Sequence, residues 1–269
     1  MAEIVREART PSRAAPTGRG CGTRMAMPIL AAGATLEGMT AIAPAALGAL
    51  SEAYAAWWID FLGEHNHVGG ADATKWLLDR SRLEPGQRML DCGAFVGAAA
   101  RMAADRLGVR AVACDISADF LQTGQRLANG GRVEWVAANT QRLPFRDGSF
   151  DSVWAMDTYI SPREMSRVAA RTGTICLCAE APNDGRGGSE SFVDEWTEYG
   201  WTLTAHKQMS SEATQAWRGV EGEMVRRRHD IEPRYGTRNY LRQLDMVANL
   251  VYAYERGEQG HGLFVFARG

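Results

Sequence analysis

The chain has 269 residues, of which 45% are hydrophobic and 23% are charged, and its formal net charge is −2. This apolar content excludes a wholly disordered chain, and the length suffices to bury the core of a large α/β domain. Because 30 basic residues are balanced by 32 acidic ones, no global positive charge would attract a polyanion, and we expect no nucleic-acid partner. The five cysteines are odd in number and scattered through apolar segments, which predicts reduced, buried thiols in a cytoplasmic protein.

A disordered N-terminal tail is predicted over residues 1–35. Its first part, residues 1–24, carries five arginines among proline, glycine, threonine and alanine and has no hydrophobic period. Two prolines and three glycines interrupt the apolar stretch 25–50 too often for a membrane helix, so no membrane span is predicted. Arg24 and residues 25–34 match a secretory signal only weakly.

The hydrophobic pattern predicts helices first and then an alternation of strands and helices. Apolar residues at helical spacing predict helices over 50–62 and 71–83, so N-terminal helices are expected within 46–82. Short apolar runs then predict strands over 88–92, 111–114, 133–137, 150–156 and 174–179, with helices over 98–107, 118–128 and 163–171. The rest of the chain predicts a helix over 190–199, a strand over 201–206, a mainly helical insert over 211–258 and a strand over 262–267.

This alternation is typical of the α/β class. Near-continuous hydrophobic strands predict a mostly parallel sheet that is covered by helices on both faces. Since the pattern shows no internal repeat, we expect a single domain over 36–269, with the insert over 211–258 forming a helical lid.

A glycine turn follows the first predicted strand. It reads Leu-Asp-Cys-Gly-Ala-Phe-Val-Gly over residues 90–97 and leads directly into a helix. Glycine lets a backbone turn tightly beside a ligand, and the start of a helix presents free N–H groups to it. A plain strand-to-helix turn would explain this segment equally well on its own.

Further polar residues follow the later strands in a definite order. Asp115 ends the second predicted strand, where a carboxylate can accept hydrogen bonds from the two hydroxyls of a ribose. Asn139 and Thr140 follow the third strand, and a Leu-Pro-Phe run comes at 143–145. The fourth strand opens with Phe-Asp and is followed by Asp157.

Taken in order, these motifs resemble those of class I S-adenosylmethionine (SAM)-dependent methyltransferases. The match is to the small-molecule branch of ubiquinone, tocopherol and sarcosine-type enzymes, and it covers residues 54–180, including the run His-Val-Gly-Gly-x-x-Ala-Thr at 67–74. The resemblance implies a Rossmann-like fold with a seven-stranded sheet, an antiparallel last strand, and SAM as the cofactor. A nicotinamide-binding domain fits poorly, because its fingerprint needs glycine at positions occupied by Phe95 and Ala98.

The resemblance also implies which residues contact the cofactor. The turn from Gly93 to Gly97 would lie against the methionine part of SAM, Asp115 would hold the ribose, and Asn139 and Thr140 would face the adenine. The expected cofactor-binding set is Asp91, Gly93, Phe95, Gly97, Asp115, Ile116, Asn139, Thr140, Met156 and Asp157. Two positions depart from the family pattern: Phe95 replaces its middle glycine, with a ring that stacks near the cofactor or turns outward, and Asn139 replaces an aspartate.

Methyl transfer needs a site that excludes water and often a base for the acceptor's proton. Glu180 and Tyr159, just past the fifth and fourth strands, are the candidates, and His67 is the rival base. A salt bridge at the sheet edge explains Glu180 equally well, and local hydrogen bonds are the alternative for His67. Cys176 and Cys178 share one face of a strand, but no second ligand pair has zinc spacing, so we expect no metal centre.

Two features of the accessory segments bear on the acceptor. Tryptophans in or beside these segments predict an aromatic-lined pocket, although each is also explained by packing; they are Trp57, Trp58, Trp76, Trp196, Trp201 and Trp217. The basic run at 226–228 either binds an anionic group of the acceptor or forms a solvated helix face.

The sequence therefore predicts SAM-dependent methyl transfer to a small organic molecule in specialised or cofactor metabolism. The expected partner is this small-molecule methyl acceptor, and a homo-oligomer is left open. The alternatives are a SAM-fold binding or regulatory protein without transferase activity, and an RNA or protein methyltransferase. The neutral charge and the lack of an appended binding module disfavour the RNA or protein methyltransferase.

Overall fold

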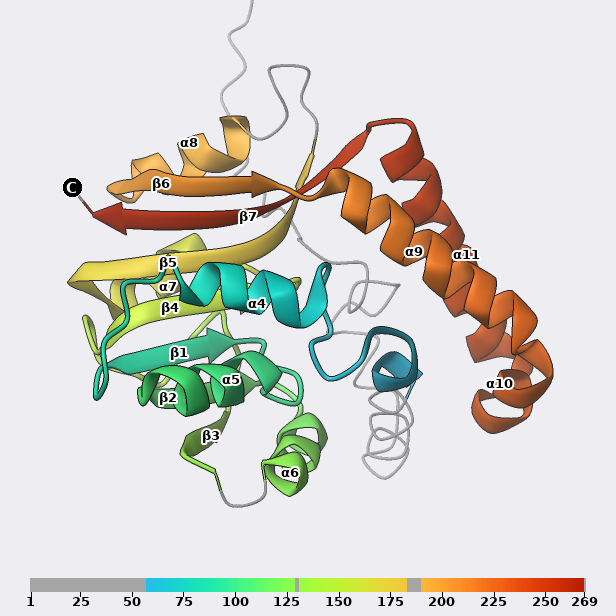
Figure 1. Ribbon diagram of the computed structural model, residues 1–269, viewed down its shortest axis with the longest axis horizontal. Coiled ribbons are helices and arrows are strands. Elements are labelled where there is room, and N and C mark those ends of the chain that lie inside the picture. The colour runs from blue at the N-terminus through green and yellow to red at the C-terminus, as the bar shows by residue number, and fades with distance from the viewer. Residues whose placement is uncertain (1–56, 129–130, 183–189, 269) are drawn as a thin grey trace, which may run out of the picture.

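The computed structural model describes residues 57–128, 131–182 and 190–268 (Figure 1). The predicted tail over 1–35, and residues 46–56 of the predicted N-terminal helices, lie outside the described residues. The described chain starts in a helix over 57–62 and continues into α4 (Gly70–Leu78).

A seven-stranded sheet forms the centre of the described chain. Its strands are β1 (Arg88–Cys92), β2 (Arg110–Asp115), β3 (Val133–Ala137), β4 (Phe150–Met156), β5 (Ala169–Pro182), β6 (Trp201–Gln208) and β7 (Gln259–Arg268). They lie in the order β3-β2-β1-β4-β5-β7-β6. β7 runs antiparallel to both of its neighbours, and the other pairs are parallel. The predicted fold, a mostly parallel seven-stranded sheet with an antiparallel last strand, is confirmed.

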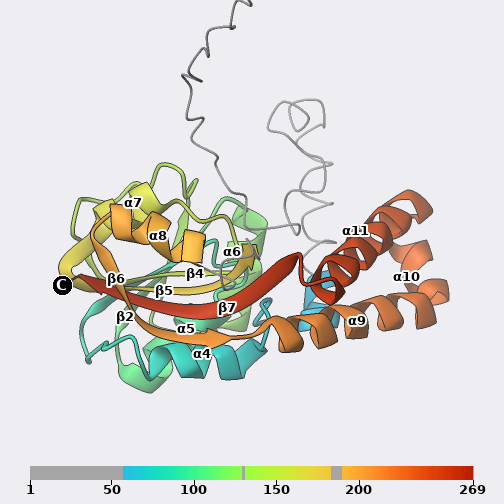
Figure 2. The same cartoon turned by 90° about the horizontal axis from the view of Figure 1, so that it is seen from above.

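Helices cover both faces of this sheet (Figures 1 and 2). The helices after α4 are α5 (Ala98–Leu107), α6 (Ala118–Leu127), α7 (Pro162–Val168), α8 (Glu190–Glu198), α9 (Ser210–Arg226), α10 (Arg228–Tyr235) and α11 (Thr237–Glu255). α4 and α5 lie on one face, and α7 and α8 lie on the other. Successive residues of a strand point to opposite faces, so Trp154 of β4 joins the core under α4 and α5 while Val153 joins the core under α7 and α8.

Two predicted helices end earlier than the pattern indicated. The helix predicted over 71–83 ends at Leu78, and the chain turns before β1 through Arg82, whose φ is +57°. The helix predicted over 163–171 ends at Val168, where Ala169 turns extended and pairs with Phe150 of β4. A short alanine-rich run fits a helix and a buried strand equally well, so pairing with β4 decides its conformation.

The stretch predicted to be helical over 211–258 forms an arm that projects beyond the sheet (Figures 1 and 2). Its helices α9 and α11 pack along each other, with an ion pair of 2.6 Å between Arg218 and Glu255, and α10 lies at the far end. The helix over 57–62 packs on this arm through Trp58, whose ring meets Trp217 edge-on at a centroid distance of 6.2 Å.

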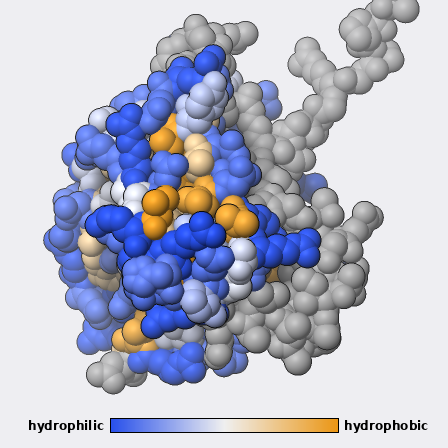
Figure 3. Space-filling model, turned by 90° about the vertical axis from the view of Figure 1, so that its right-hand side faces the viewer, coloured by the Kyte–Doolittle hydropathy of each residue, from blue (hydrophilic) through white to orange (hydrophobic). Residues whose placement is uncertain are grey.

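The surface seen from the side of the arm has apolar patches among hydrophilic side chains (Figure 3). Val225 of α9 and Leu241 of α11 are about half exposed, at 56% and 48%. Among the described residues, no helix has both the length and the apolar character needed to cross a membrane.

Candidate functional site at the carboxyl edge of the sheet

The carboxyl ends of β1, β2, β4 and β5 meet at one edge of the sheet, because these strands are parallel. β7 runs the other way, so its first residues lie at the same edge, where His261 is the partner of Glu180 in β5. Most residues predicted for the site lie within one of the parallel strands or within five residues of its carboxyl end. The fold therefore gathers polar groups from distant parts of the chain at one edge, where ligands bind in sheets of this kind.

The glycine turn after β1 requires its two glycines. Gly93 and Gly97 both have φ of +67°, a left-handed conformation that L residues rarely adopt. A Cβ atom on Gly93 would lie 2.0 Å from the Thr158 hydroxyl oxygen, and one on Gly97 would lie 2.6 Å from the Trp135 ring. The turn thus packs directly against its neighbours.

Phe95 occupies the centre of this turn and also has a left-handed backbone, with φ of +53°. Its side chain is buried and meets the ring of Phe120 in α6 edge-on, at a centroid distance of 4.9 Å. The ring therefore packs into the protein core, and the backbone keeps the conformation that a glycine would adopt there.

Asp115, at the end of β2, binds the same turn. One of its oxygens accepts a hydrogen bond of 2.9 Å from the Phe95 amide, and the other accepts one of 2.9 Å from the Ser117 amide. Burial raises the pKa of Asp115 to about 6, although these amides favour the ionised form. The Ile116 amide is a third donor to this carboxylate, which leaves one acceptor position that a ribose hydroxyl could use.

Asp91, within β1, is almost completely buried, with 2% of its surface exposed. Burial raises its pKa to about 7, against the effect of a hydrogen bond from the Ala100 amide in the first turn of α5. Its Oδ1 atom accepts no hydrogen bond from the described residues. A buried carboxylate oxygen without a donor is costly, so this atom suits a ligand that brings one.

The residues expected at the adenine end are more exposed. Ile116 is 56% exposed directly after β2, and Asn139 is exposed directly beyond the end of β3. The Asn139 side-chain oxygen accepts a hydrogen bond of 2.9 Å from the Gln141 amide, which shapes this loop, and Thr140 is half-buried. Met156, the last residue of β4, is buried in the core.

The three candidate bases differ in their surroundings. Glu180 is half-buried, and desolvation raises its pKa to about 7; its carboxylate accepts a weak hydrogen bond of 3.4 Å from Gln259. His67 is 6% exposed and, like His65, has a ring nitrogen 3.0 Å from the Thr74 hydroxyl. Burial lowers the pKa of His67, so its ring is neutral. Tyr159 is half-buried two residues beyond Asp157.

A second polar cluster was not anticipated from the sequence. His261 at the start of β7 has its Nδ1 atom 2.9 Å from the Tyr254 hydroxyl of α11 and its Nε2 atom 3.1 Å from Oδ1 of Asp157. The same Nε2 atom lies 3.4 Å from Sγ of Cys178 in β5. The members come from two separate parts of the chain, so no sequence spacing connects them.

Charge and burial act against each other in this cluster. Burial disfavours the charged forms of both Asp157 and His261, but their mutual attraction prevails: the pKa of Asp157 is lowered and that of His261 is raised. The other Asp157 oxygen accepts a hydrogen bond of 2.8 Å from the Val68 amide. The cluster therefore anchors the loop that carries His67.

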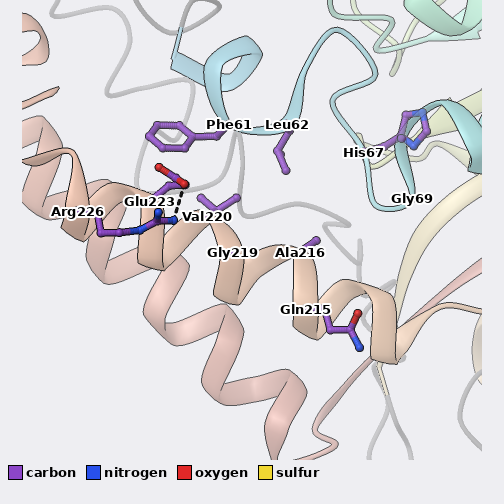
Figure 4. A pocket seen from close by; sticks show the side chains of 11 residues that line it. Phe61, Leu62, His67, Gly69, Gln215, Ala216, Gly219, Val220, Glu223 and Arg226 are labelled. Atoms are coloured by element: carbon purple, nitrogen blue, oxygen red, sulfur yellow. Dashed lines mark hydrogen bonds and ion pairs between the residues drawn. The ribbon is translucent and has the colours of Figure 1, made fainter. Parts of the chain in front are cut away.

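A cavity of about 420 Å³ lies beside this loop, between the helix over 57–62 and α9 (Figure 4). Phe61 and Leu62 point toward α9, and small residues of α9, Ala216 and Gly219, leave room opposite them. Its polar lining includes His67 at one end and the Glu223–Arg226 ion pair at the other. None of the six tryptophans predicted to line a pocket belongs to this lining.

The basic run at 226–228 is balanced by acidic neighbours. Arg226 pairs with Glu223, Arg228 lies 2.7 Å from Glu232, and Arg227 lies 3.7 Å from Asp60 in the helix over 57–62. Exposed pairs of this kind contribute little stability. Since Arg226 also lines the cavity, it is the arginine of this run that is placed to meet a ligand there.

Comparison with known proteins agrees with the geometry of this edge. Residues 89–175 match the family described as a methyltransferase domain. A demethylmenaquinone methyltransferase of Clavibacter sepedonicus is 39% identical over 102 residues, which are 35% of this chain. The chain spans only 41% of that relative's length.

Solved structures share the fold over most of the chain. Haemonchus contortus phosphoethanolamine N-methyltransferase 2, in complex with phosphomonomethylethanolamine and S-adenosylhomocysteine, has a TM-score of 0.67 at 16% identity, with 81% of this chain and 57% of that chain covered. The [4+2]-cyclase SpnF has a TM-score of 0.69 at 17% identity, with 83% and 95% covered. Residues 89–175 therefore match a methyltransferase-domain family, and the seven-stranded sheet that contains them has the fold of these solved structures.

Proposed function

We propose that the chain transfers a methyl group from SAM to a small organic acceptor, in the cytoplasm and in specialised or cofactor metabolism. One observation carries this proposal: the buried Asp115 carboxylate, at the end of β2, accepts a hydrogen bond from the glycine turn after β1. In sheets of this class, these two positions bind the ribose and the adjoining part of a nucleotide-type cofactor. We further propose that residues 36–269 form a single domain.

The residues at this edge fit SAM. Asp91 offers a buried oxygen that lacks a donor, and Asp115 offers an acceptor position for a ribose hydroxyl. Ile116 presents an exposed apolar side chain immediately after Asp115, as the flat face of an adenine requires. When bound, SAM supplies an electrophilic methyl group on its sulfonium.

The cavity beside α9 is the proposed acceptor site. Its volume of about 420 Å³ suits a small organic molecule. Phe61, Leu62 and Val220 would bury an apolar part of the acceptor, and Arg226 would meet a polar or anionic group at its outer end. The arm of α9 to α11 then acts as the lid that excludes water.

Glu180 is the proposed base for acceptors that must lose a proton, with Tyr159 orienting the acceptor and His67 as the competing base. Glu180 belongs to β5 at the carboxyl edge, and the Gln259 side chain donates a long hydrogen bond of 3.4 Å to its carboxylate. A carboxylate held this loosely can accept a proton from another group. His67 is less suited, because both of its ring nitrogens already have hydrogen-bonding neighbours.

The cofactor part of the proposal is tested by calorimetry with SAM. Replacing Asp115 by alanine should weaken SAM binding by about 1.5–3 kcal/mol, the usual value for hydrogen bonds to a charged group. Glu134, an exposed carboxylate in the neighbouring strand β3, provides the control, and Glu134→Ala should bind SAM normally. Unchanged SAM affinity in a folded Asp115→Ala protein would rule out this cofactor site.

A second function deserves a direct test, since the fold is similar to that of a [4+2]-cyclase. Fold alone does not fix the reaction, and a SAM-fold protein can bind the cofactor without transferring its methyl group. Incubation of the protein with SAM and a metabolite extract separates the two functions. Formation of S-adenosylhomocysteine supports methyl transfer, and tight SAM binding without turnover in any extract supports the alternative.

A further inference from the structure

Three side chains bring metal-ligating atoms together. They are Asp157 just past the end of β4, Cys178 within β5 and His261 near the start of β7. His261 Nε2 lies 3.1 Å from Asp157 Oδ1 and 3.4 Å from Cys178 Sγ, and the three atoms lie within 4.8 Å of one another. Around a tetrahedral zinc ion, a nitrogen and an oxygen ligand are about 3.3 Å apart, and a nitrogen and a sulfur ligand about 3.6 Å. The two spacings from His261 Nε2 are each shorter than these values by about 0.2 Å.

The cluster leaves one acceptor incompletely satisfied. Oδ1 of Asp157 is buried and its closest polar partner is the His261 imidazole at 3.1 Å, which is not aligned for a hydrogen bond. The His261 side chain is 1% exposed and that of Asp157 is 9% exposed, so water gives little compensation. A cation between the three ligand atoms would satisfy this oxygen.

Neighbouring groups hold two of the three ligands in position. The Tyr254 hydroxyl occupies His261 Nδ1 at 2.9 Å and so leaves Nε2 for a metal, and the Val68 amide binds the second oxygen of Asp157 at 2.8 Å. Asp157 itself has a left-handed backbone, with φ of +48°, a conformation that aspartate adopts more readily than most residues. Val68 lies between His67 and Gly69, which both line the cavity beside α9, so the cluster sits close behind the cavity wall.

We propose that Asp157, Cys178 and His261 bind a divalent transition-metal ion, with zinc as the best match. One thiolate, one imidazole and one carboxylate are all zinc ligands, and the two anionic groups would balance the charge of the ion. Three protein ligands leave one tetrahedral position for water or for an acceptor atom. A role in positioning the acceptor rests on the proposed methyl transfer, but binding of the ion does not.

The test uses the full chain, freed of metal with a chelator and then titrated with Co²⁺, which reports thiolate coordination through charge-transfer absorption. We expect one equivalent of Co²⁺ to bind with this absorption and Zn²⁺ to displace it. Cys178→Ser should abolish the charge-transfer absorption, and His261→Gln should weaken the affinity at least 100-fold. Tyr254→Phe removes only the hydrogen bond to His261 and should weaken it about tenfold.

Cys176 provides the matched control, because it is buried on the same face of β5 and contacts the Ser152 hydroxyl at 3.8 Å. Cys176→Ser should bind Co²⁺ as the wild type does. The proposal is overturned if the wild-type protein gives no charge-transfer absorption at micromolar Co²⁺, or if Cys178→Ser retains it. Melting temperatures with and without Zn²⁺ provide a second readout, since only proteins with an intact site should be stabilised. None of these measurements depends on SAM or on turnover.

Discussion

Phe95 combines a left-handed backbone with a buried ring, and two substitutions separate the energies of these features. Phe95→Ala removes the ring that packs on Phe120 and keeps a Cβ atom at φ of +53°. Loss of a buried phenylalanine side chain costs about 3–5 kcal/mol. Phe95→Gly loses the same ring but also relieves the left-handed strain, which amounts to about 1 kcal/mol. We therefore expect the glycine protein to lose only about 2–4 kcal/mol.

The decisive result is which of the two variants is more stable, because a protein with alanine at a given position is normally more stable than one with glycine there. Urea unfolding should show the glycine variant to be more stable than the alanine variant by about 1 kcal/mol, or about 2–4 °C in melting temperature. Phe120 is the matched control, since it supplies the other ring of the contact but lies inside α6. There, glycine should be about 1 kcal/mol less stable than alanine. Equal or reversed stabilities at position 95 would refute the strained-turn reasoning.

Three further predictions concern binding and turnover. SAM affinity should fall at least tenfold from pH 7 to pH 5, because Asp115, with a pKa of about 6, becomes protonated and loses acceptor capacity; calorimetry on Asp115→Asn should show a weaker dependence, which comes from Asp91 with its pKa of about 7. Gly219→Leu should fill the cavity beside α9, where a Cβ atom meets no neighbour, and raise the acceptor KM without changing SAM affinity. Glu180→Gln should reduce turnover by roughly two to four orders of magnitude at unchanged SAM affinity. His67→Ala should have a smaller effect, and near-normal turnover in Glu180→Gln would assign Glu180 a structural role.

The strands were the most predictable elements, for a physical reason. Strands of a parallel sheet are buried on both faces, so they appear as continuous apolar runs bounded by polar residues. The bounds predicted for β1, β3 and β4 agree with the structure. β5 was predicted to start at residue 174 but starts at Ala169, because its first residues are held by pairing with β4 and by the helix end at Val168.

The cofactor side of the site was predictable because its residues follow consecutive strands in a fixed order. Gly93 and Asp115 lie at strand ends and Gly97 immediately precedes α5, and the structure joins the turn between the two glycines to Asp115; their roles toward SAM stay predictions. Tyr254 and His261 could not be found in this way. They reach the site only because the chain returns through α11 and enters the sheet antiparallel, which depends on contacts between distant segments.

β7 lies between β5 and β6 in the sheet, although it follows both of them in the chain. During synthesis, β6 therefore has no sheet partner until β7 has emerged from the ribosome, and one edge of β5 stays unpaired. An open strand edge invites pairing with other chains. Completion of the sheet requires insertion of β7 between two strands that are already made, a late, long-range step in folding. The order of the strands thus makes the nascent protein most prone to aggregation in the interval before β7 docks.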